Sequence, residues 1–355
     1  MKKVFFLFLI ASLFSCQQSN DSTIQNVESA YASRQMDSDD STNNFYDNVE
    51  LYDLKVNKLE IAGEINSPGV INTSQLPVRS IIVKEALPTK DGNTFVGAFR
   101  YDGYSLFDLL NAHTPNKINR EAFPPIIDLY VVIENARGEK AVFSWGEIYY
   151  ANHLHEIIIA NKVMRIVPSK TNELWPLPTN AKVVAGGDLL TSRNIESPVK
   201  ITVKSATREF EIEKGMSPMF APNIDVFVGD DLSFSINKPN EDLKAVSYES
   251  TFYGRGRGIH STTPFNGQMM REVLSGQIQL SAETLRESYL IFAAKDGYRG
   301  VFTYSEIFNR NDQAELLLIY MPENNDGGAF RLFPAGDFFS DRAISSLNRI
   351  YFDKL

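Results

Sequence analysis

The sequence is poor in cysteine. Cys16 is the single thiol among 355 residues, and it lies close to the amino terminus. The remainder of the chain, which has an ordinary globular composition, therefore cannot form a disulfide, a thiolate metal site or a cysteine nucleophile. These three kinds of chemistry are excluded from the body of the protein.

The chain also lacks an excess of positive charge and a long apolar run. It has 35 Lys and Arg against 44 Asp and Glu, a formal net charge of −9. Binding to a phosphate backbone depends on Lys and Arg, so we do not expect nucleic acid as a partner. The apolar run at residues 4–14 is too short to span a membrane as a helix, which takes about 20 residues.

That short apolar run has the form of an export signal. Lys2 and Lys3 precede it, and it ends in Leu13-Phe14-Ser15-Cys16. This ending resembles the lipobox of bacterial lipoproteins. The resemblance implies cleavage before Cys16, acylation of its thiol, and a cell-envelope location on the outer membrane or the periplasmic face. An ordinary secretory signal with an incidental cysteine is the alternative.

Composition divides the rest of the chain. Residues 16–50 are rich in Ser, Asn, Asp and Gln and have few large apolar side chains. Such a segment cannot bury enough surface to offset the entropy of ordering it, so we predict a disordered tether. The remaining length corresponds to two domains, which we place at residues 51–205 and 206–355.

The two predicted domains resemble each other. Residues 101–110 parallel 265–274: each has an aromatic residue, an Asx-Gly pair and apolar residues at helical spacing. Residues 142–148 match 301–307, and 184–188 match 333–337. Arg193 and Arg342 each follow the last Asp of the preceding match by five residues. We interpret this as an internal duplication and expect Asp188–Arg193 and Asp337–Arg342 to be internal ion pairs.

Each copy predicts the same mixture of elements. A short amphipathic helix is expected after an Asx-Gly turn, and another helix or turn near Glu147. Alternating or β-branched segments predict strands at residues 58–62, 129–134, 141–145, 199–203, 209–213 and 232–236. The expected fold class is α+β, with mixed and mostly antiparallel sheets.

These motifs resemble the molybdopterin-binding domain of the sulfite oxidase family. The resemblance rests on Leu59-Glu60-Ile61-Ala62-Gly63-Glu64-Ile65 with Pro68 close behind, on the turn and helix of residues 101–110, and on segments 128–148 and 183–201. It covers residues 57–204 and, more faintly, 208–353. It implies two tandem molybdopterin-binding domains.

This chain lacks the metal ligand of that family, which is a cysteine thiolate that holds molybdenum together with the pterin. The corresponding stretches contain Glu85 and Glu249 and no cysteine. A carboxylate is a harder ligand and prefers other metals. Two interpretations stay open: these residues are altered ligands, or they are surface or hydrogen-bonded carboxylates. Molybdopterin is therefore a candidate cofactor without its usual protein ligand.

The most unusual local sequence is Gly254-Arg255-Gly256-Arg257-Gly258, followed by His260. Glycine permits close backbone approach, and arginine can bind carboxylate or phosphate through two hydrogen bonds. Two interpretations of this loop stay open: a flexible exposed loop, or a site for a small anion. His153 and His155 would share one side of a strand, but two imidazoles fall short of the three or four ligands of a zinc site. We predict no metal site.

Together these features predict a non-catalytic lipoprotein of the cell envelope, anchored to the membrane through lipid on Cys16. It would bind a small anionic ligand or a partner protein, with Arg255, Arg257, His260, Glu249 and Glu85 as candidate binding residues. The alternative is a molybdopterin-dependent oxidoreductase that lacks the cysteine ligand. No catalytic residue is predicted.

Overall fold

The computed structural model describes residues 46, 49–168, 170–216, 219–323 and 327–355. Residues 51–165 and 174–355 form one compact unit. The other unit comprises residues 1–50 and 166–173, and within it the Asn172 N–H donates to the Pro168 carbonyl at 2.9 Å. Cys16 and most of the predicted tether lie outside the described residues. Within the described ranges, no helix is long and apolar enough to cross a membrane.

The larger unit consists mainly of strands, so the prediction of an α+β fold is wrong. Strands make up 44% and helices 10% of the structure, in small and mostly antiparallel sheets arranged as a ring that resembles a four-blade β-propeller. The physical reason is helix length. The predicted helices exist, but each α-helix described has at most six residues. Such short turns cap strands and cannot form a layer against a sheet.

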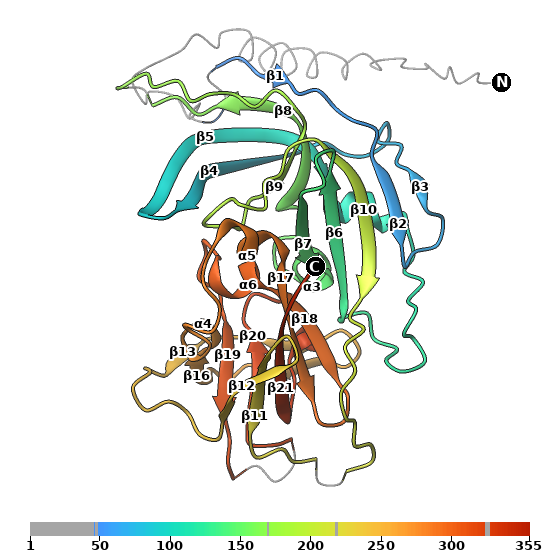
Figure 1. Ribbon diagram of the computed structural model, residues 1–355, viewed down its shortest axis with the longest axis vertical. Helices are drawn as coiled ribbons and strands as arrows, with labels where there is room; N and C mark the ends of the chain where they lie inside the picture. Colours follow the sequence, from blue (N-terminus) through green and yellow to red (C-terminus); the bar gives the residue numbers. More distant parts are fainter. Residues whose placement is uncertain (1–45, 47–48, 169, 217–218, 324–326) are drawn as a thin grey trace, which may run out of the picture. The chain divides into compact units, whose positions relative to one another are not determined.

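The first half is drawn from blue to yellow-green in Figure 1. Its elements are β1 (Tyr52–Asp53), β2 (Glu60–Gly63), β3 (Gly69–Val70), β4 (Arg79–Thr89), β5 (Gly92–Ser105), α2 (Leu106–Asn111), β6 (Leu129–Asn135), β7 (Lys140–Ser144), α3 (Trp145–Tyr149), β8 (Ile157–Arg165), β9 (Lys182–Ala185) and β10 (Pro198–Ser205).

The second half runs from yellow to red in the same view. Its elements are β11 (Ile224–Val228), β12 (Asp231–Ile236), β13 (Val246–Tyr248), β14 (Phe252–Gly254), β15 (Gly258–Ser261), β16 (Phe265–Met269), α4 (Met270–Val273), α5 (Ala282–Glu287), β17 (Ser288–Ala294), β18 (Arg299–Thr303), α6 (Tyr304–Phe308), β19 (Leu316–Tyr320), β20 (Phe330–Pro334), the 3₁₀ turn η1 (Ser340–Arg342) and β21 (Leu347–Lys354).

Both halves have the same sheet topology. One sheet of the first half has the order β3-β2-β10-β6-β7, and its counterpart has the order β12-β11-β21-β17-β18. In each, the second and third strands run parallel (β2 with β10, β11 with β21). The other sheets follow β4-β5-β8, with β9 on β8, and β13-β16-β19-β20. The strands thus correspond one to one across the two copies, apart from the short β1 and the β14–β15 hairpin.

Equivalent residues begin the helices α3 and α6. The Ser144 hydroxyl accepts from the Glu147 N–H at 2.9 Å, and the Ser144 N–H donates to the Glu147 carboxylate at 2.7 Å. Thr303 and Glu306 make the same pair of hydrogen bonds, at 3.2 and 2.7 Å. This capping box satisfies amide groups that a helix start leaves without partners. It fixes both glutamates at the same place in each copy.

The repeated Asx-Gly pairs do not form the turns that the sequence predicts. Asp102-Gly103 lies within β5, and Asn266-Gly267 lies within β16. A Cβ atom on Gly103 would lie 2.2 Å from the Ile159 carbonyl oxygen, and one on Gly267 would lie 2.5 Å from that of Leu318. Glycine is required at both positions because the neighbouring strand passes too close for a side chain.

Most of the predicted strands are present. Those at residues 129–134, 141–145, 199–203 and 232–236 correspond to β6, β7, β10 and β12, and the strand expected at 58–62 spans 60–63. The strand predicted at 209–213 is wrong, since residues 206–216 contain none. Polar and apolar residues do alternate in this segment, but it does not form a ladder of hydrogen bonds with another strand. Instead, the Glu213 N–H donates to the Lys295 carbonyl, and Phe210 packs on Tyr351.

Each half has its own apolar core, and a further core joins the two. The joining cluster contains Tyr130, Val132 and Val142 of the first half and Ile291, Val301 and Tyr351 of the second. The Tyr130 and Tyr289 rings stack across it at 4.8 Å. The Val301 N–H also donates to the Ile127 carbonyl at 3.0 Å. The halves therefore form one body, and the residues between them are positioned by both copies.

Candidate functional site

A buried arginine lies in each half at the contact with the other. Arg193 donates to Asp188 at 2.8 and 2.6 Å and to Glu147 at 2.9 and 3.0 Å. It also reaches across to the Thr303 hydroxyl at 3.3 Å. The predicted internal pair of Asp188 with Arg193 is confirmed.

Arg342 repeats this arrangement in the opposite direction. It donates to Asp337 at 2.8 and 2.6 Å, to Glu306 at 2.8 Å, and across to the Ser144 hydroxyl at 3.0 Å. The predicted pair of Asp337 with Arg342 is thereby confirmed. We call these two arginines and their four carboxylates, Glu147, Asp188, Glu306 and Asp337, the arginine centre.

The backbone around the arginine centre has the same pseudo-twofold relation. Ala151 forms an isolated β-bridge with Asp337, and its counterpart is the bridge of Arg310 with Asp188. The Phe338 N–H donates to the Tyr150 carbonyl at 2.6 Å, as the Leu189 N–H donates to the Asn309 carbonyl at 2.7 Å. Each copy therefore pairs with the other through equivalent residues.

Burial dominates the electrostatics of this centre. It raises the pKa of Glu147 to about 7 against the opposing effect of Arg193, and the Glu306 carboxylate adds to the increase. Burial likewise raises the pKa of Asp188 and of Asp337, while the arginine beside each lowers it. Four carboxylates face two guanidinium groups, so full ionisation would leave an excess of negative charge in a region removed from water.

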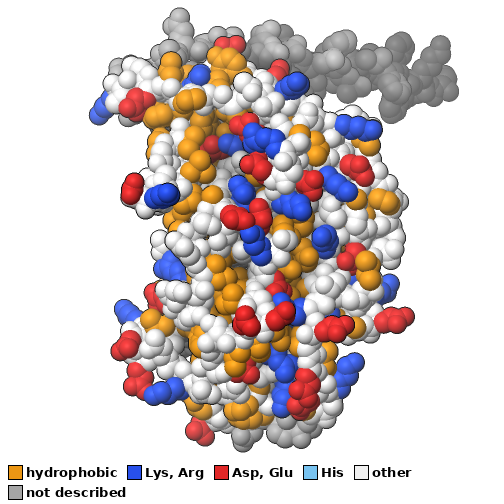
Figure 2. Space-filling view, viewed as in Figure 1, with side chains coloured by type: hydrophobic (Ala, Val, Ile, Leu, Met, Phe, Trp, Pro, Cys, Tyr) orange, Lys and Arg blue, Asp and Glu red, His pale blue; other side chains and the backbone are white. Residues whose placement is uncertain are grey.

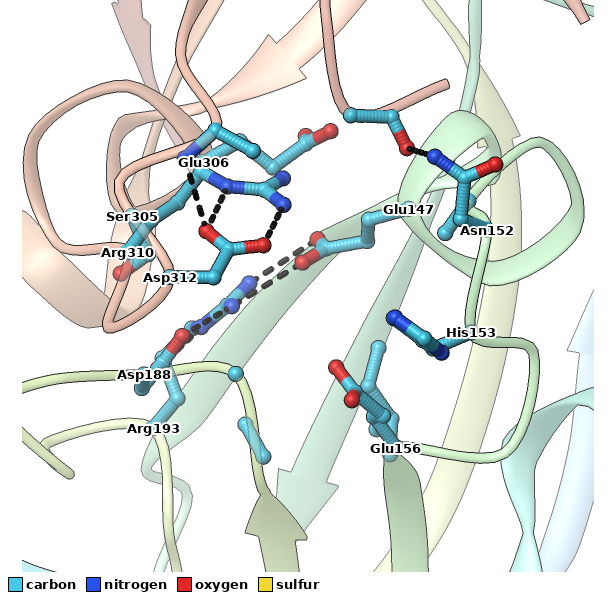
Figure 3. Close-up of a pocket in the computed structure, with 16 residues that line it drawn as sticks. Glu147, Asn152, His153, Glu156, Asp188, Arg193, Ser305, Glu306, Arg310 and Asp312 are labelled. Atoms are coloured by element: carbon cyan, nitrogen blue, oxygen red, sulfur yellow. Dashed lines mark hydrogen bonds and ion pairs between the residues drawn. The ribbon is translucent and has the colours of Figure 1, made fainter. Parts of the chain in front are cut away.

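A polar cleft of about 210 Å³ opens beside the arginine centre (Figure 3). The close-up shows Arg193 between Asp188 and Glu147, with Arg310 held by Asp312 at 2.8 and 2.5 Å. Both arginines already have carboxylate partners, which makes them poor receptors for a further anion. We interpret the polar cleft as the edge of the structural contact between the halves.

A second cavity, of about 390 Å³, has a different lining. Its walls come mainly from the first half, with two residues from the second. We call it the aromatic cavity; it is lined by Leu110, Asn111, His113, Thr114, Pro115, Ile126, Trp145, Tyr149, Tyr150, Arg255 and Phe339. Trp145 and Tyr149 stack within it at 4.5 Å. Its volume is in the range of small-molecule sites, and none of these lining residues is acidic.

Two hydrogen-bond donors that belong to lining residues of the aromatic cavity are sealed from solvent and have no partner among the described residues. They are the Trp145 indole Nε1 and the Tyr150 hydroxyl. Both side chains belong to residues that are only 2% exposed. A buried polar group without a hydrogen bond costs about 1–3 kcal/mol, so two beside one cavity are unusual. Burial also raises the pKa of Tyr150 to about 12, so its hydroxyl keeps its proton at neutral pH.

Arg255 brings a positive charge to the rim of this cavity. Its side chain is 52% exposed, and its guanidinium lies 5.8 Å from the centre of the Tyr150 ring. Asp341 is its acidic neighbour, with 3.6 Å from Arg255 Nε to the carboxylate. Of the residues that the sequence proposed for anion binding, Arg255 is thus the one that lines this cavity.

The equivalent groups in the second half have partners within the protein. Tyr304 and Phe308 stack at 4.3 Å, as Trp145 and Tyr149 do. The Tyr304 hydroxyl, however, donates to the Ile278 carbonyl at 3.5 Å. Asn309, the counterpart of Tyr150, exchanges two hydrogen bonds of 2.8 Å with the Leu190 backbone. The groups that remain unpaired in the first copy are satisfied in the second.

Glu85 belongs to a closed network on β4. Its carboxylate accepts from Lys182 at 2.7 and 2.8 Å, from Asn194 at 3.0 Å and from the Tyr101 hydroxyl at 3.3 Å. Because both carboxylate oxygens accept hydrogen bonds and the residue is buried, Glu85 is not suited to be a molybdenum ligand. Of the two interpretations left open for Glu85, the hydrogen-bonded carboxylate is the one that these contacts support.

The remaining sequence candidates are dispersed. Glu249 and Arg257 are exposed, the latter in the turn between β14 and β15. His260 lies on β15, with its ring 5.4 Å from that of Phe252. His153 and His155 occupy a bend and a turn, and His155 Nδ1 lies 3.0 Å from the Ser105 hydroxyl. Across the described ranges, no three His, Cys, Asp or Glu side chains are grouped to hold a metal ion.

Sequence reasoning missed Trp145, Tyr150 and Phe339. A signal for them was present in the repeat: Trp145 stands where the other copy has Tyr304, and Tyr150 stands where it has Asn309. Differences between aligned copies indicate where one copy has changed its role. No known protein family and no curated protein matches this chain.

Proposed function

We propose that the protein is a non-catalytic lipoprotein of the cell envelope that binds one small anionic ligand in the aromatic cavity. The observation that carries this proposal is the position of the half-exposed Arg255 at a cavity whose lining contains no acidic residue. A guanidinium group recognises an anion by charge and by hydrogen bonds.

The surface supports recognition in a cavity over recognition by a broad charged patch. On the face seen in Figure 2, Lys and Arg side chains are interspersed with Asp and Glu. This face has no extended region of one sign to attract a polyanion. We therefore favour a small ligand over a partner protein bound through charge.

Binding can be followed through the protein's own fluorescence. The chain has two tryptophans, of which Trp145 lines the aromatic cavity. In the mature lipidated chain carrying Trp175→Phe, a small anion should change the emission of Trp145 in a saturable manner. Arg255→Ala should weaken binding about tenfold or more, whereas Arg257→Ala, at an exposed neighbouring arginine, should leave it unchanged. An equal response from Arg255→Ala and the parent chain would contradict the proposal.

The location is a separate prediction, resting on the lipobox-like sequence before Cys16. Cys16→Ser should abolish incorporation of a labelled fatty acid and release the protein from the membrane fraction, since stable anchoring depends on buried acyl chains. Labelling that persists in Cys16→Ser would contradict lipid attachment at this residue. The alternative of a molybdopterin enzyme predicts molybdenum and pterin in protein purified from its native host, at near-stoichiometric amounts.

A further inference from the structure

Resting on the proposed function, we infer that the ligand of the aromatic cavity is a sugar acid, free or at the end of a saccharide chain. Such a ligand is a pyranose ring that carries one carboxylate and several hydroxyl groups. Five polar side chains of the lining, each exposed or half-buried, point to this class: Asn111, His113, Thr114, Tyr149 and Arg255. The sealed donors described above are not needed for it.

Three of these side chains have no partner to give up when a ligand binds. Asn111 and Thr114 are exposed, and Tyr149 is half-buried. Within the part of the chain that the structure describes, none of the three side chains forms a hydrogen bond with the protein. The Tyr149 hydroxyl differs from that of Tyr150 in being open to solvent. The lining therefore offers accessible polar groups beside the charge of Arg255.

The lining offers acceptors as well as donors. His113 Nδ1 lies 3.1 Å from the Ser67 carbonyl oxygen, which can only accept, so Nε2 of the neutral ring keeps its lone pair. Burial and the Asp108 charge raise the pKa of Tyr149, so its hydroxyl keeps its proton at neutral pH. The Asn111 amide and the Thr114 hydroxyl can both donate and accept. Hydroxyl groups match this mixture, whereas an aromatic carboxylate has no donor to offer.

The charge of the rim selects among polyhydroxylated anions. Arg255 supplies one positive charge, and Asp341 lies close to it: its carboxylate accepts from the Arg255 backbone N–H at 3.2 Å and lies 3.6 Å from Arg255 Nε. The Asp341 charge offsets part of the guanidinium charge. A doubly charged phosphate would lose more hydration than this partly neutralised site returns. A single carboxylate, as in a uronic acid, matches the site better.

The apolar part of the lining suits the ring of a sugar. Pro115, Ile126, Tyr149 and Phe339 are half-buried, so they present apolar surface that is not sealed. A pyranose has faces of C–H groups that can cover such surface, and hydroxyl groups at its edge that reach polar side chains. A fatty acid would cover the same surface and leave the polar side chains without use.

The repeat limits this site to one per chain. When the match of residues 101–110 with 265–274 is continued, Thr114 aligns with Ile278, and Tyr149 aligns with Phe308. Both counterparts lack the hydroxyl group. Arg255 lies between β14 and β15, in the hairpin that has no counterpart in the first half. The cation and the hydroxyl groups are therefore brought together at the cavity of the first copy.

The test uses the mature lipidated chain in a detergent without a sugar headgroup and isothermal titration. The probes are D-glucuronate, D-galacturonate, the neutral D-glucose and D-galactose, benzoate and inorganic phosphate. We expect at least one uronate to bind at one site per chain, about tenfold or more tighter than its neutral parent sugar, benzoate or phosphate. The methyl glycoside of that uronate separates the two sources: it binds equally well if the site takes a chain end and loses binding if the site takes the free acid.

Variants assign the contacts. Tyr149→Phe and Thr114→Val keep the shape of the walls and remove one hydroxyl each, so each should weaken uronate binding about threefold or more. Arg255→Ala should remove the preference for the uronate over its neutral parent sugar. Arg257→Ala is the matched control and should bind as the parent chain does.

The outcomes separate this inference from the proposed function. If benzoate or phosphate binds in a manner that depends on Arg255 and neither uronate binds, the sugar acid is wrong and anion binding stands. If a uronate binds but Tyr149→Phe and Thr114→Val have no effect, the assigned hydroxyl contacts are wrong. A neutral sugar that binds as tightly as its uronate would contradict the role of the charge. If no anion binds, or Arg255→Ala binds them as the parent does, the proposed function fails together with the inference.

Discussion

The two copies place equivalent residues at the two ends of the arginine centre and leave them in different states. In the second copy, Tyr304 and Asn309 have hydrogen-bond partners in the protein. In the first, Trp145 and Tyr150 hold the same positions beside a cavity and have none. A buried polar group with a hydrogen-bond partner contributes to stability, whereas a buried group left unpaired costs free energy in the folded protein.

The arginine centre extends the comparison. Its arginines are as deeply buried as the donors of the aromatic cavity, yet every charged group there has a partner from its own copy or from the other. We therefore assign the arginine centre to stability and the aromatic cavity to binding. The following predictions separate these assignments, from the largest expected effect to the smallest.

Arg342→Ala should cost the most stability. It leaves Asp337 and Glu306 buried without their cation, and breaking a buried ion pair typically costs about 3–5 kcal/mol. Urea unfolding followed by circular dichroism measures this loss. Arg257→Ala, an exposed control, should change the free energy of unfolding by about 0.5 kcal/mol or less. A loss below about 1 kcal/mol for Arg342→Ala would mean that the arginine centre does not hold the halves together.

The free energy of unfolding should fall as the pH rises from 4.5 to 7. The pKa of Glu147 is about 7 in the folded chain against an ordinary 4.5, so the folded state binds the proton more strongly in this interval. The contribution of Glu147 is fully present below about 4.5 and is lost as the pH passes 7, by up to about 1.4 kcal/mol per pH unit. Glu147→Gln should flatten the profile. An unchanged slope would assign the dependence to other groups.

Removing the hydroxyl groups of two tyrosines should have different effects on stability. Tyr150→Phe removes a buried hydroxyl without a partner and should leave the unliganded chain equally stable or more stable, by about 1 kcal/mol. Tyr101→Phe removes a hydroxyl that donates to Glu85 and should destabilise by about 1 kcal/mol. Thermal unfolding of the two variants measures both changes in stability. Equal destabilisation by both would indicate that the Tyr150 hydroxyl has a partner in the unliganded protein.

The strands and the internal ion pairs could be predicted because they depend on local pattern. The β-branched residues of β6 and β10 and the spacing of Asp188 and Arg193 carry their own signal. The fold class could not be predicted, because the length of each helix depends on where the preceding strand ends. Residues 101–105 continue β5 instead of forming a turn. Gly103 was interpreted as a turn residue although its role is set by Ile159, which is distant in sequence.

The sequence by itself determined the absence of thiol chemistry beyond Cys16, the excess of acidic residues, the duplication and the choice of Arg255 as a candidate. Only the tertiary structure decided that Arg255 lines the same cavity as Trp145 and Tyr150, and that Glu85 forms an ion pair with Lys182. The physical reason is that a sequence reveals which groups can donate or accept. Whether each group is paired depends on neighbours from both copies, which the fold alone brings together.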